Sequence, residues 1–196
     1  STTLTATFVA VVATFPGLNI DLACANKVLR LIGHASSFTL DCPAFSITAG
    51  AAAKLALTTA PTASTSSTIV FQAPPVVTIQ DASGNTRFAD TLAVTVALTT
   101  GSGVLGGTTA VAAASGVVNF SGLSIDLVGN DKVLTFSSGA LSSVASGTLT
   151  ITVAAAAKLA LTTAPTASTA SAAAFAAQPA VTIQDASGNA RLADSL

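Results

Sequence analysis

The sequence of 196 residues contains no Met, Trp or Tyr, a single His and two Cys, and only 8% of its residues are charged. His34, two thiols and eight scattered acidic residues do not assemble into a catalytic constellation, so we expect no enzyme activity and no cofactor. The missing Trp and Tyr disfavour a sugar-binding platform, because such platforms usually depend on those rings. Without Met, Ser1 is no retained initiator, and we expect a chain that was processed, as after removal of a signal peptide, or cut from a longer one.

The few charges nearly cancel, with 7 basic residues against 8 acidic ones and no basic run. Nucleic acid and anionic lipid are bound through basic patches, so we expect neither as a partner. Lys54, Lys158 and frequent Thr, Ser and Gly interrupt the apolar stretches before any reaches the roughly 18 to 20 residues of a membrane helix. Half of the residues are nevertheless hydrophobic (51%), which is too many for a disordered chain.

A long repeat organises what is present. Residues 54–90 return almost unchanged and without a gap as residues 158–194, at a spacing of 104 residues. This period is too long for a solenoid unit and fits one small domain per repeat, so it indicates duplicated modules.

The ends of the chain extend the pattern. Residues 14–33 align with residues 119–138 at a shift of 105, with Gly17 on Gly122 and Asp21 on Asp126. We therefore predict three parts: the C-terminal half of a module, a complete module and the N-terminal half of a module (residues 1–50, 51–153 and 154–196). Neither half can close a sheet structure alone, because each would leave free strand edges and an uncovered apolar face.

The complete period predicts an all-β fold, an antiparallel β-sandwich of about seven strands. Short runs of β-branched residues alternate with turn signals, as in VVTIQD (76–81), where Val77 and Ile79 share one face. The Ala-rich pieces VAAAAKLAL (153–161) and AAAFAAQ (172–178) are expected to be extended, with strands at 158–163 and 172–175, because the counterpart of the second piece contains Ile69, Val70 and a double proline. The predicted strands are 54–59, 68–71, 76–81, 92–100, 117–125, 132–138 and 147–153. The predicted core consists of Val77, Ile79, Val94, Val96, Leu98, Phe120, Leu123, Leu134, Phe136 and Ile151.

The repeat unit, with KLALTTAP, VVTIQDASGN, GSGVLGGTTAVAAASGVVNFSGLSI and KVLTFSSGAL, resembles the bacterial immunoglobulin-like repeats found in tandem in very large cell-surface and secreted proteins. The resemblance covers essentially the whole chain. It implies tandem immunoglobulin-like sandwiches in stalks, adhesins or extracellular fibres, with no shared active site.

The two cysteines, Cys24 and Cys42, both lie in the first half-module. In a hairpin of 27–33 with 37–42 their strands would be neighbours, so we predict a disulfide, the second interpretation being two buried thiols. A metal site is disfavoured, because two cysteines without a matching His do not make four ligands.

The segments DASGN at 81–85 and 185–189 are predicted to be turns between strands, since Asp and Asn accept local backbone hydrogen bonds and Gly tolerates positive φ. A calcium loop is the alternative, with Asp81, Asn85, Asp185 and Asn189 as ligands, but it would need about six oxygens. Arg87 between the acids is expected to form a surface ion pair. Asn119 is the first residue of the one glycosylation sequon, Asn119-Phe120-Ser121. A sequon makes N-glycosylation possible but does not require it.

We therefore expect a structural subunit or segment of an extracellular filament or surface stalk. The half-modules suggest a homopolymer in which successive copies complete each other head to tail by strand complementation. The competing explanation for the half-modules is a window cut from a longer tandem protein. The alternative function is a segment of a large adhesin or carbohydrate-binding surface protein, with host or surface glycans as partners.

Overall fold

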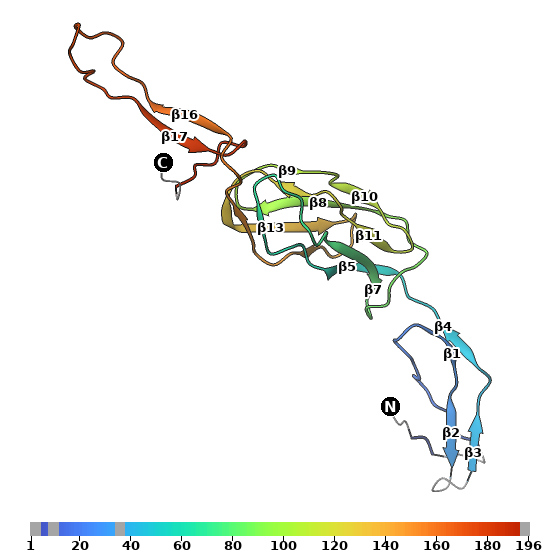
Figure 1. Cartoon of the computed structure of the whole chain (residues 1–196). Helices are drawn as coiled ribbons and strands as arrows, with labels where there is room; N and C mark the ends of the chain where they lie inside the picture. The colour runs from blue at the N-terminus through green and yellow to red at the C-terminus, as the bar shows by residue number, and fades with distance from the viewer. Residues whose placement is uncertain (1–4, 8–11, 34–37, 193–196) are drawn as a thin grey trace.

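The computed structural model describes residues 5–7, 12–33 and 38–192, and throughout these residues the fold is all-β, as predicted. The strands form three parts along one elongated molecule (Figure 1). We call them the N-terminal segment (12–33 and 38–50), the central body (51–153) and the C-terminal hairpin (154–192). The described part of the chain contains no helix long and apolar enough to cross a membrane.

The central body contains sheets of six, three and two strands. Its strands are β5 (Ala52–Thr59), β6 (Ser64–Ser66), β7 (Val76–Asp81), β8 (Ala93–Thr100), β9 (Leu105–Gly106), β10 (Ala110–Ala112), β11 (Val117–Asn119), β12 (Ser124–Ile125), β13 (Gly129–Ser137), β14 (Val144–Ala145) and β15 (Leu149–Thr152). The six-stranded sheet has the order β10-β8-β13-β15-β6, with β14 also paired to β13. The three-stranded sheet has the order β11-β7-β5, and β12 pairs with β9.

One hydrophobic core joins the two larger sheets. Val94 and Val96 of β8 point inward and alternate with exposed residues, the period-two pattern of a half-buried strand. Val77 and Ile79 of β7 come from the other sheet and are fully buried in the same cluster. All ten predicted core residues belong to this cluster, with Leu98 only partly buried. The core also contains Leu55, Phe71, Ala113, Val118, Ile125 and Leu149.

Three features of the central body differ from the prediction. Residues 68–71 are not a strand; the chain pairs earlier, at β6, and turns at Thr68, whose φ is +62°. The antiparallel pattern is broken where β6 runs parallel to β15 and at an isolated parallel bridge between Lys54 and Ser142. The strands are also shorter and more numerous than seven, since turns with positive φ at Gly107, Gly116 and Gly122 divide the later part of the body.

The N-terminal segment repeats the pairing of the later strands of the central body. Its strands are β1 (Cys24–Lys27), β2 (Arg30–Gly33), β3 (Phe38–Asp41) and β4 (Phe45–Ile47). Arg30 pairs with Asp41 between β2 and β3, at the positions where Thr135 pairs with Ala145 between β13 and β14. The pairing of β1 with β4 corresponds in the same way to that of β13 with β15, down to a shift of register at the same place.

The C-terminal hairpin repeats the pairing of the earlier strands. Its strands are β16 (Lys158–Thr163) and β17 (Ala180–Gln184). Lys158 pairs with Gln184 just as Lys54 pairs with Gln80 between β5 and β7. The Ala-rich residues 172–178 between the two strands are neither helix nor strand, so the expected strand at 172–175 is absent.

Candidate functional site: a polar joint that occurs twice

The segment DASGN at the end of β7 is a tight turn, as predicted. Gly84 has a φ of +90°, which a residue with a Cβ rarely adopts. The backbone N–H of Asn85 donates to Asp81 Oδ1 (2.9 Å), and the Asn85 amide Nδ2 donates to Asp81 Oδ2 (2.8 Å). Asp81 therefore fixes both the backbone and the side chain of Asn85, and both residues are buried.

The fixed Asn85 side chain reaches out of the central body to the N-terminal segment. Its Nδ2 donates to the carbonyl O of Asp21 (2.7 Å), and its Oδ1 accepts the N–H of Ala23 (2.8 Å). A carboxamide carries one donor and one acceptor group, as a peptide unit does, so Asn85 pairs with the loop before β1 as a short piece of strand would.

Two further contacts fasten the same place. The N–H of Gly50, which follows β4, donates to Asp81 Oδ2 (2.8 Å). Arg87 Nη1 donates to the carbonyl O of Gly50 (2.6 Å), while the guanidinium also forms an ion pair with Asp90 (3.0 Å), confirming that predicted pair. We call this set the first joint: Asp21, Ala23, Gly50, Asp81, Asn85 and Arg87.

The same contacts recur between the central body and the C-terminal hairpin. Asn189 Nδ2 donates to the carbonyl O of Asp126 (2.8 Å), and Asn189 Oδ1 accepts the N–H of Val128 (3.2 Å). Asp185 holds Asn189 through Oδ1 (2.9 Å) and Oδ2 (2.8 Å), and its Oδ2 accepts the N–H of Ala154 (3.2 Å). We call this set the second joint: Asp126, Val128, Ala154, Asp185, Asn189 and Arg191, the last of which donates to the carbonyl O of Ala154.

The second joint contains one more side chain. The hydroxyl of Ser67, which follows β6, donates to the carbonyl O of Asp126 (2.5 Å) and accepts from Asn189 Nδ2 (3.1 Å). Ser67 is almost completely buried there. The early strands of the central body thus help to hold the loop that Asn189 grips, and the described residues supply no counterpart of Ser67 in the first joint.

The hydrogen bonds of each joint favour ionised carboxylates. The side-chain and backbone bonds from Asn85, together with the bond from Gly50, lower the pKa of Asp81 to about 2 against the opposing effect of burial. Burial is the largest influence on Asp185 and raises its pKa, but the combined bonds from Asn189, Ala154 and Ser187 outweigh it and the pKa is lowered. Both joints therefore hold a negative charge satisfied by N–H donors.

The calcium interpretation competes with these donors for the same oxygens. In each joint the Asp carboxylate accepts hydrogen bonds from the following Asn and from a backbone N–H, and the Asn oxygen accepts another. No group of three or more His, Cys, Asp or Glu that could hold a metal occurs among residues 5–7, 12–33 and 38–192. What this arrangement does chemically is to fasten one part of the molecule to the next.

Cys24 and Cys42 are both free thiols in the structure, so the predicted disulfide is absent. The hairpin that motivated it does form, but its register places the cysteines apart. The N–H of Cys42 bonds to the carbonyl O of Leu29, whereas Cys24 pairs with Ile47. Five positions separate Cys24 from Leu29 and five separate Cys42 from Ile47, so the two cysteines occupy different places along the paired chains.

Asn119 and His34 are the remaining candidates. Asn119 is an exposed residue at the end of β11, so its sequon stays a prediction. His34 lies outside the described residues.

No protein-family model matches the chain, and no curated protein matches it. Evidence about function therefore comes from the joints themselves. The sequence predicted the turns but not their contacts with Asp21 and Asp126. The sequence did contain one signal for these contacts. The segment IDL, which contains Asp21 or Asp126, and the segment DASGN, which contains Asn85 or Asn189, both occur twice with nearly the same separation.

Proposed function

We propose that the chain is a structural segment or subunit of an extracellular filament or surface stalk, in which modules are linked in a fixed geometry by the Asp–Asn joint. One observation carries this proposal: the same hydrogen bonds, between equivalent residues, form at both ends of the central body. A contact that repeats with the sequence period gives each module the same relation to the next, and the result is a linear array.

We further propose that the modules are tandem immunoglobulin-like β-sandwiches. The central body (51–153) is then one complete module, residues 1–50 the C-terminal half of another and residues 154–196 the N-terminal half of a third. The core shared by two sheets supports the sandwich. The assignment of the two half-modules is supported by their strand registers. The register of β2 with β3 matches that of β14 with β13, and the register of β16 with β17 matches that of β5 with β7.

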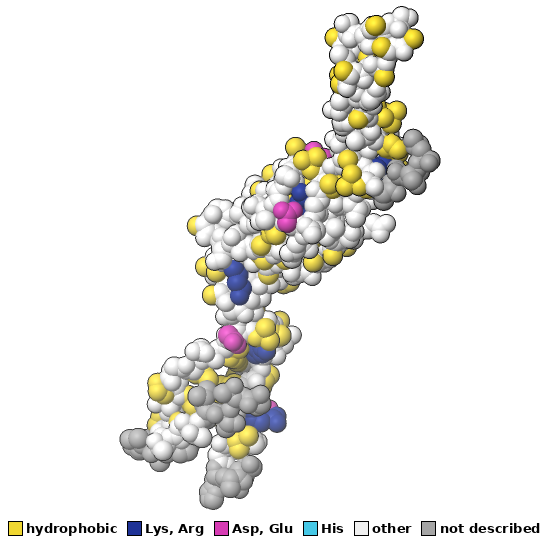
Figure 2. Space-filling model, turned by 90° about the vertical axis from the view of Figure 1, so that its left-hand side faces the viewer, with side chains coloured by type: hydrophobic (Ala, Val, Ile, Leu, Met, Phe, Trp, Pro, Cys, Tyr) yellow, Lys and Arg dark blue, Asp and Glu magenta, His cyan; other side chains and the backbone are white. Residues whose placement is uncertain are grey.

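The extracellular location is part of the same proposal. Its support is the resemblance to tandem repeats of surface proteins and a surface with few charges, visible as the scarcity of dark blue and magenta in Figure 2. The proposal assigns the chain a mechanical role with no catalysis.

The test is to remove the two joint amides, Asn85→Ala and Asn189→Ala, in the full chain. Each substitution removes the group that pairs with the preceding loop, so we expect a wider distribution of angles between the three parts. Electron microscopy of single particles and small-angle X-ray scattering both measure this. Asn130→Ala is the matched control, because Asn130 is an exposed residue of β13. A double variant as straight and rigid as the control would refute the proposal.

A further inference from the structure

The C-terminal hairpin exposes an apolar face whose equivalent is buried in the central body. Leu159 is 67% exposed, whereas Leu55, its equivalent in β5, is 4% exposed. Val181 is 59% exposed, whereas Val77 in β7 is completely buried. Figure 2 shows hydrophobic side chains spread over this protruding hairpin. Because the two hairpins have the same register, the difference lies only in what covers them.

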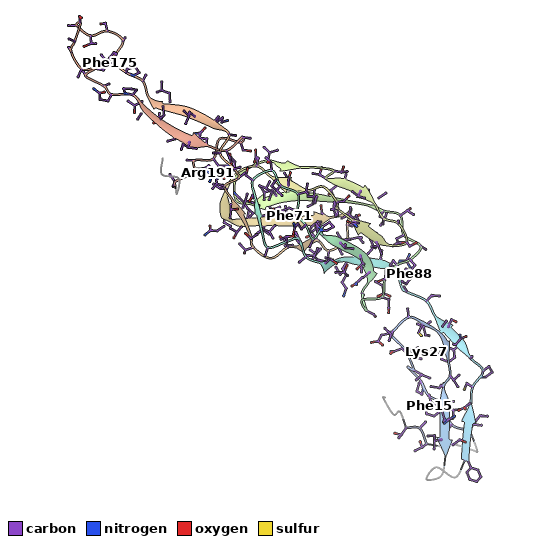
Figure 3. The ribbon with its side chains drawn as sticks, in the orientation of Figure 1. Phe15, Lys27, Phe71, Phe88, Phe175 and Arg191 are labelled. Atoms are coloured by element: carbon purple, nitrogen blue, oxygen red, sulfur yellow. The ribbon has the colours of Figure 1, made fainter. Side chains whose placement is uncertain are left out.

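The loop between β16 and β17 shows the same difference. Phe71 lies within the central body with 4% of its surface exposed, whereas its equivalent Phe175 lies near the tip of the hairpin and is 42% exposed (Figure 3). Thr68 and Ala172 both have positive φ, at +62° and +61°, so the loop already has the central body's backbone conformation. Residues 168–170, the equivalents of β6, belong to no strand.

The N-terminal segment presents the complementary half. In the central body the later strands and the turns between them cover β5 and the loop before β7: the N–H of Leu55 bonds to Ser142 O (2.9 Å), and the N–H of Phe71 bonds to Leu123 O (3.0 Å). The equivalents of those later strands are β1–β4. The N-terminal segment too leaves apolar side chains uncovered, since Leu18, which precedes β1, is 40% exposed, whereas its equivalent Leu123 is 1% exposed.

The edge of β4 is open where β15 is covered. In the central body β6 runs parallel to β15, with Thr150, Ile151 and Thr152 facing β6. Along the described residues β4 pairs only with β1. A hollow lies beside this edge at the first joint, and its lining includes Ile47, Thr48 and the exposed Phe88.

The two halves of one chain cannot cover each other, because the whole central body separates them (Figure 1). We propose, on the basis of the array proposed above, that the apolar face of β16–β17 and the loop before Phe175 bind the N-terminal segment of a second copy of this chain. Residues 168–170 then run parallel to residues 46–48 of that copy, in the register of β6 against β15. Among the described residues none corresponds to β8, so this interface is the one that β5, β6 and β7 make with β13, β14 and β15.

Ser171 adds a polar contact to this interface. Ser171 is the equivalent of Ser67, which donates to the loop that Asn189 grips. In the docked pair the Ser171 hydroxyl would donate to Asp21 O of the second copy. This supplies the side chain that the first joint lacks and makes every joint in the array alike.

Disulfide trapping across this register tests the proposal. Both native cysteines are replaced (Cys24→Ser, Cys42→Ser), and Thr48→Cys is combined with Ala170→Cys in the full chain. These positions correspond to Thr152 and Ser66, whose hydroxyl oxygens lie 3.3 Å apart. We expect mild oxidation to give a ladder of covalent dimers and higher multimers on a non-reducing gel, and reductant to collapse it to monomer.

Two matched variants in the same background control the chemistry. Ser66→Cys with Thr152→Cys should form a disulfide within one chain, which shows that this register permits the bond. Ile47→Cys with Ala170→Cys moves one thiol to the opposite face of its strand, so its ladder should be at least tenfold weaker.

The outcomes of this experiment test the docking of a second copy separately from the proposed array of modules. Monomers alone from the Thr48/Ala170 pair, with the Ser66/Thr152 bond formed, would overturn docking of a second copy. Equal ladders from the Thr48 and Ile47 pairs would overturn the register. Neither result affects the array proposal, which depends on the rigidity of the joints within a single chain and fails only if loss of both joint amides leaves the molecule unchanged.

Discussion

Phe120 and Phe136 pack against each other in the core, where both rings are completely buried, tilted by 50° and with their centroids 5.2 Å apart. Replacing Phe120 by Ala would leave a cavity between the two sheets. We expect this to cost about 3 to 5 kcal/mol of unfolding free energy, a large share of the stability of a small domain. Urea unfolding of the full chain measures the loss. Phe88→Ala is the control, because Phe88 is 72% exposed, and an equal loss in both variants would contradict the prediction.

Gly116 lies against the backbone of Arg87, a residue of the first joint. It has a φ of +70°, and a Cβ at this position would lie 2.3 Å from the carbonyl O of Arg87. We expect Gly116→Ala to destabilise the central body by about 1 to 3 kcal/mol and to displace Arg87. Gly147→Ala is the control in the same denaturant experiment, since a Cβ there meets no atom within 4 Å. Indistinguishable unfolding curves for the two variants would contradict the prediction and show that the backbone at Arg87 shifts without cost to make room for the Cβ.

The DASGN turns make the joints sensitive to acid. The pKa of Asp81 is lowered from 3.8 to about 2, and that of Asp185 is lowered too. A carboxylate with a lowered pKa in the folded state contributes stability above its unfolded pKa and loses it as the pH falls through the folded pKa. We therefore expect the joints to weaken between about pH 4 and pH 2, with full strength at neutral pH.

Thermal unfolding between pH 5 and pH 2 measures this effect. The comparison is with the double variant Asp81→Asn and Asp185→Asn, in which an amide replaces the carboxylate at the end of β7 and the one at the equivalent position after β17. The unmodified chain should lose more stability than the variant over this range. Parallel curves would contradict the pH prediction.

The repeat made the hairpins predictable from sequence. Residues 27–33 were expected to pair with 37–42, and β2 and β3 do pair within those ranges. Residues 158–163 were predicted as extended from their counterpart at 54–59, which overrode the helix propensity of the neighbouring alanines. These predictions succeeded because strand alternation and turn residues are local properties of the sequence.

The failures concern properties that are not local. Ile69, Val70 and Phe71 have high strand propensity, but positive φ at Thr68 turns the chain so that Phe71 enters the core from a loop. The register between β1 and β4 keeps Cys24 away from Cys42. The contact between Asn85 and Asp21 joins residues 64 positions apart, and no local pattern announces such a pairing.

Two kinds of contact with different chemistry hold the whole molecule together. The joints between parts are polar, and hydrogen bonds fix their geometry. The contacts inside the central body are apolar and bury a continuous core. The proposed array needs both, because apolar contacts alone would hold the parts together without fixing the angle between them.

Self-association should therefore depend on the apolar face of the C-terminal hairpin and not on nonspecific hydrophobic contacts elsewhere on the surface. We expect Leu159→Asp with Val181→Asp to abolish association of full chains, because charges would enter positions whose equivalents are buried in the central body. The central body should melt unchanged, since both side chains are exposed within one copy. Sedimentation across a concentration series measures the association. Leu92→Asp is the control, because Leu92 is 48% exposed and lies in the central body, away from β16 and β17. If the double variant associates as strongly as this control, the face between β16 and β17 does not receive a second copy.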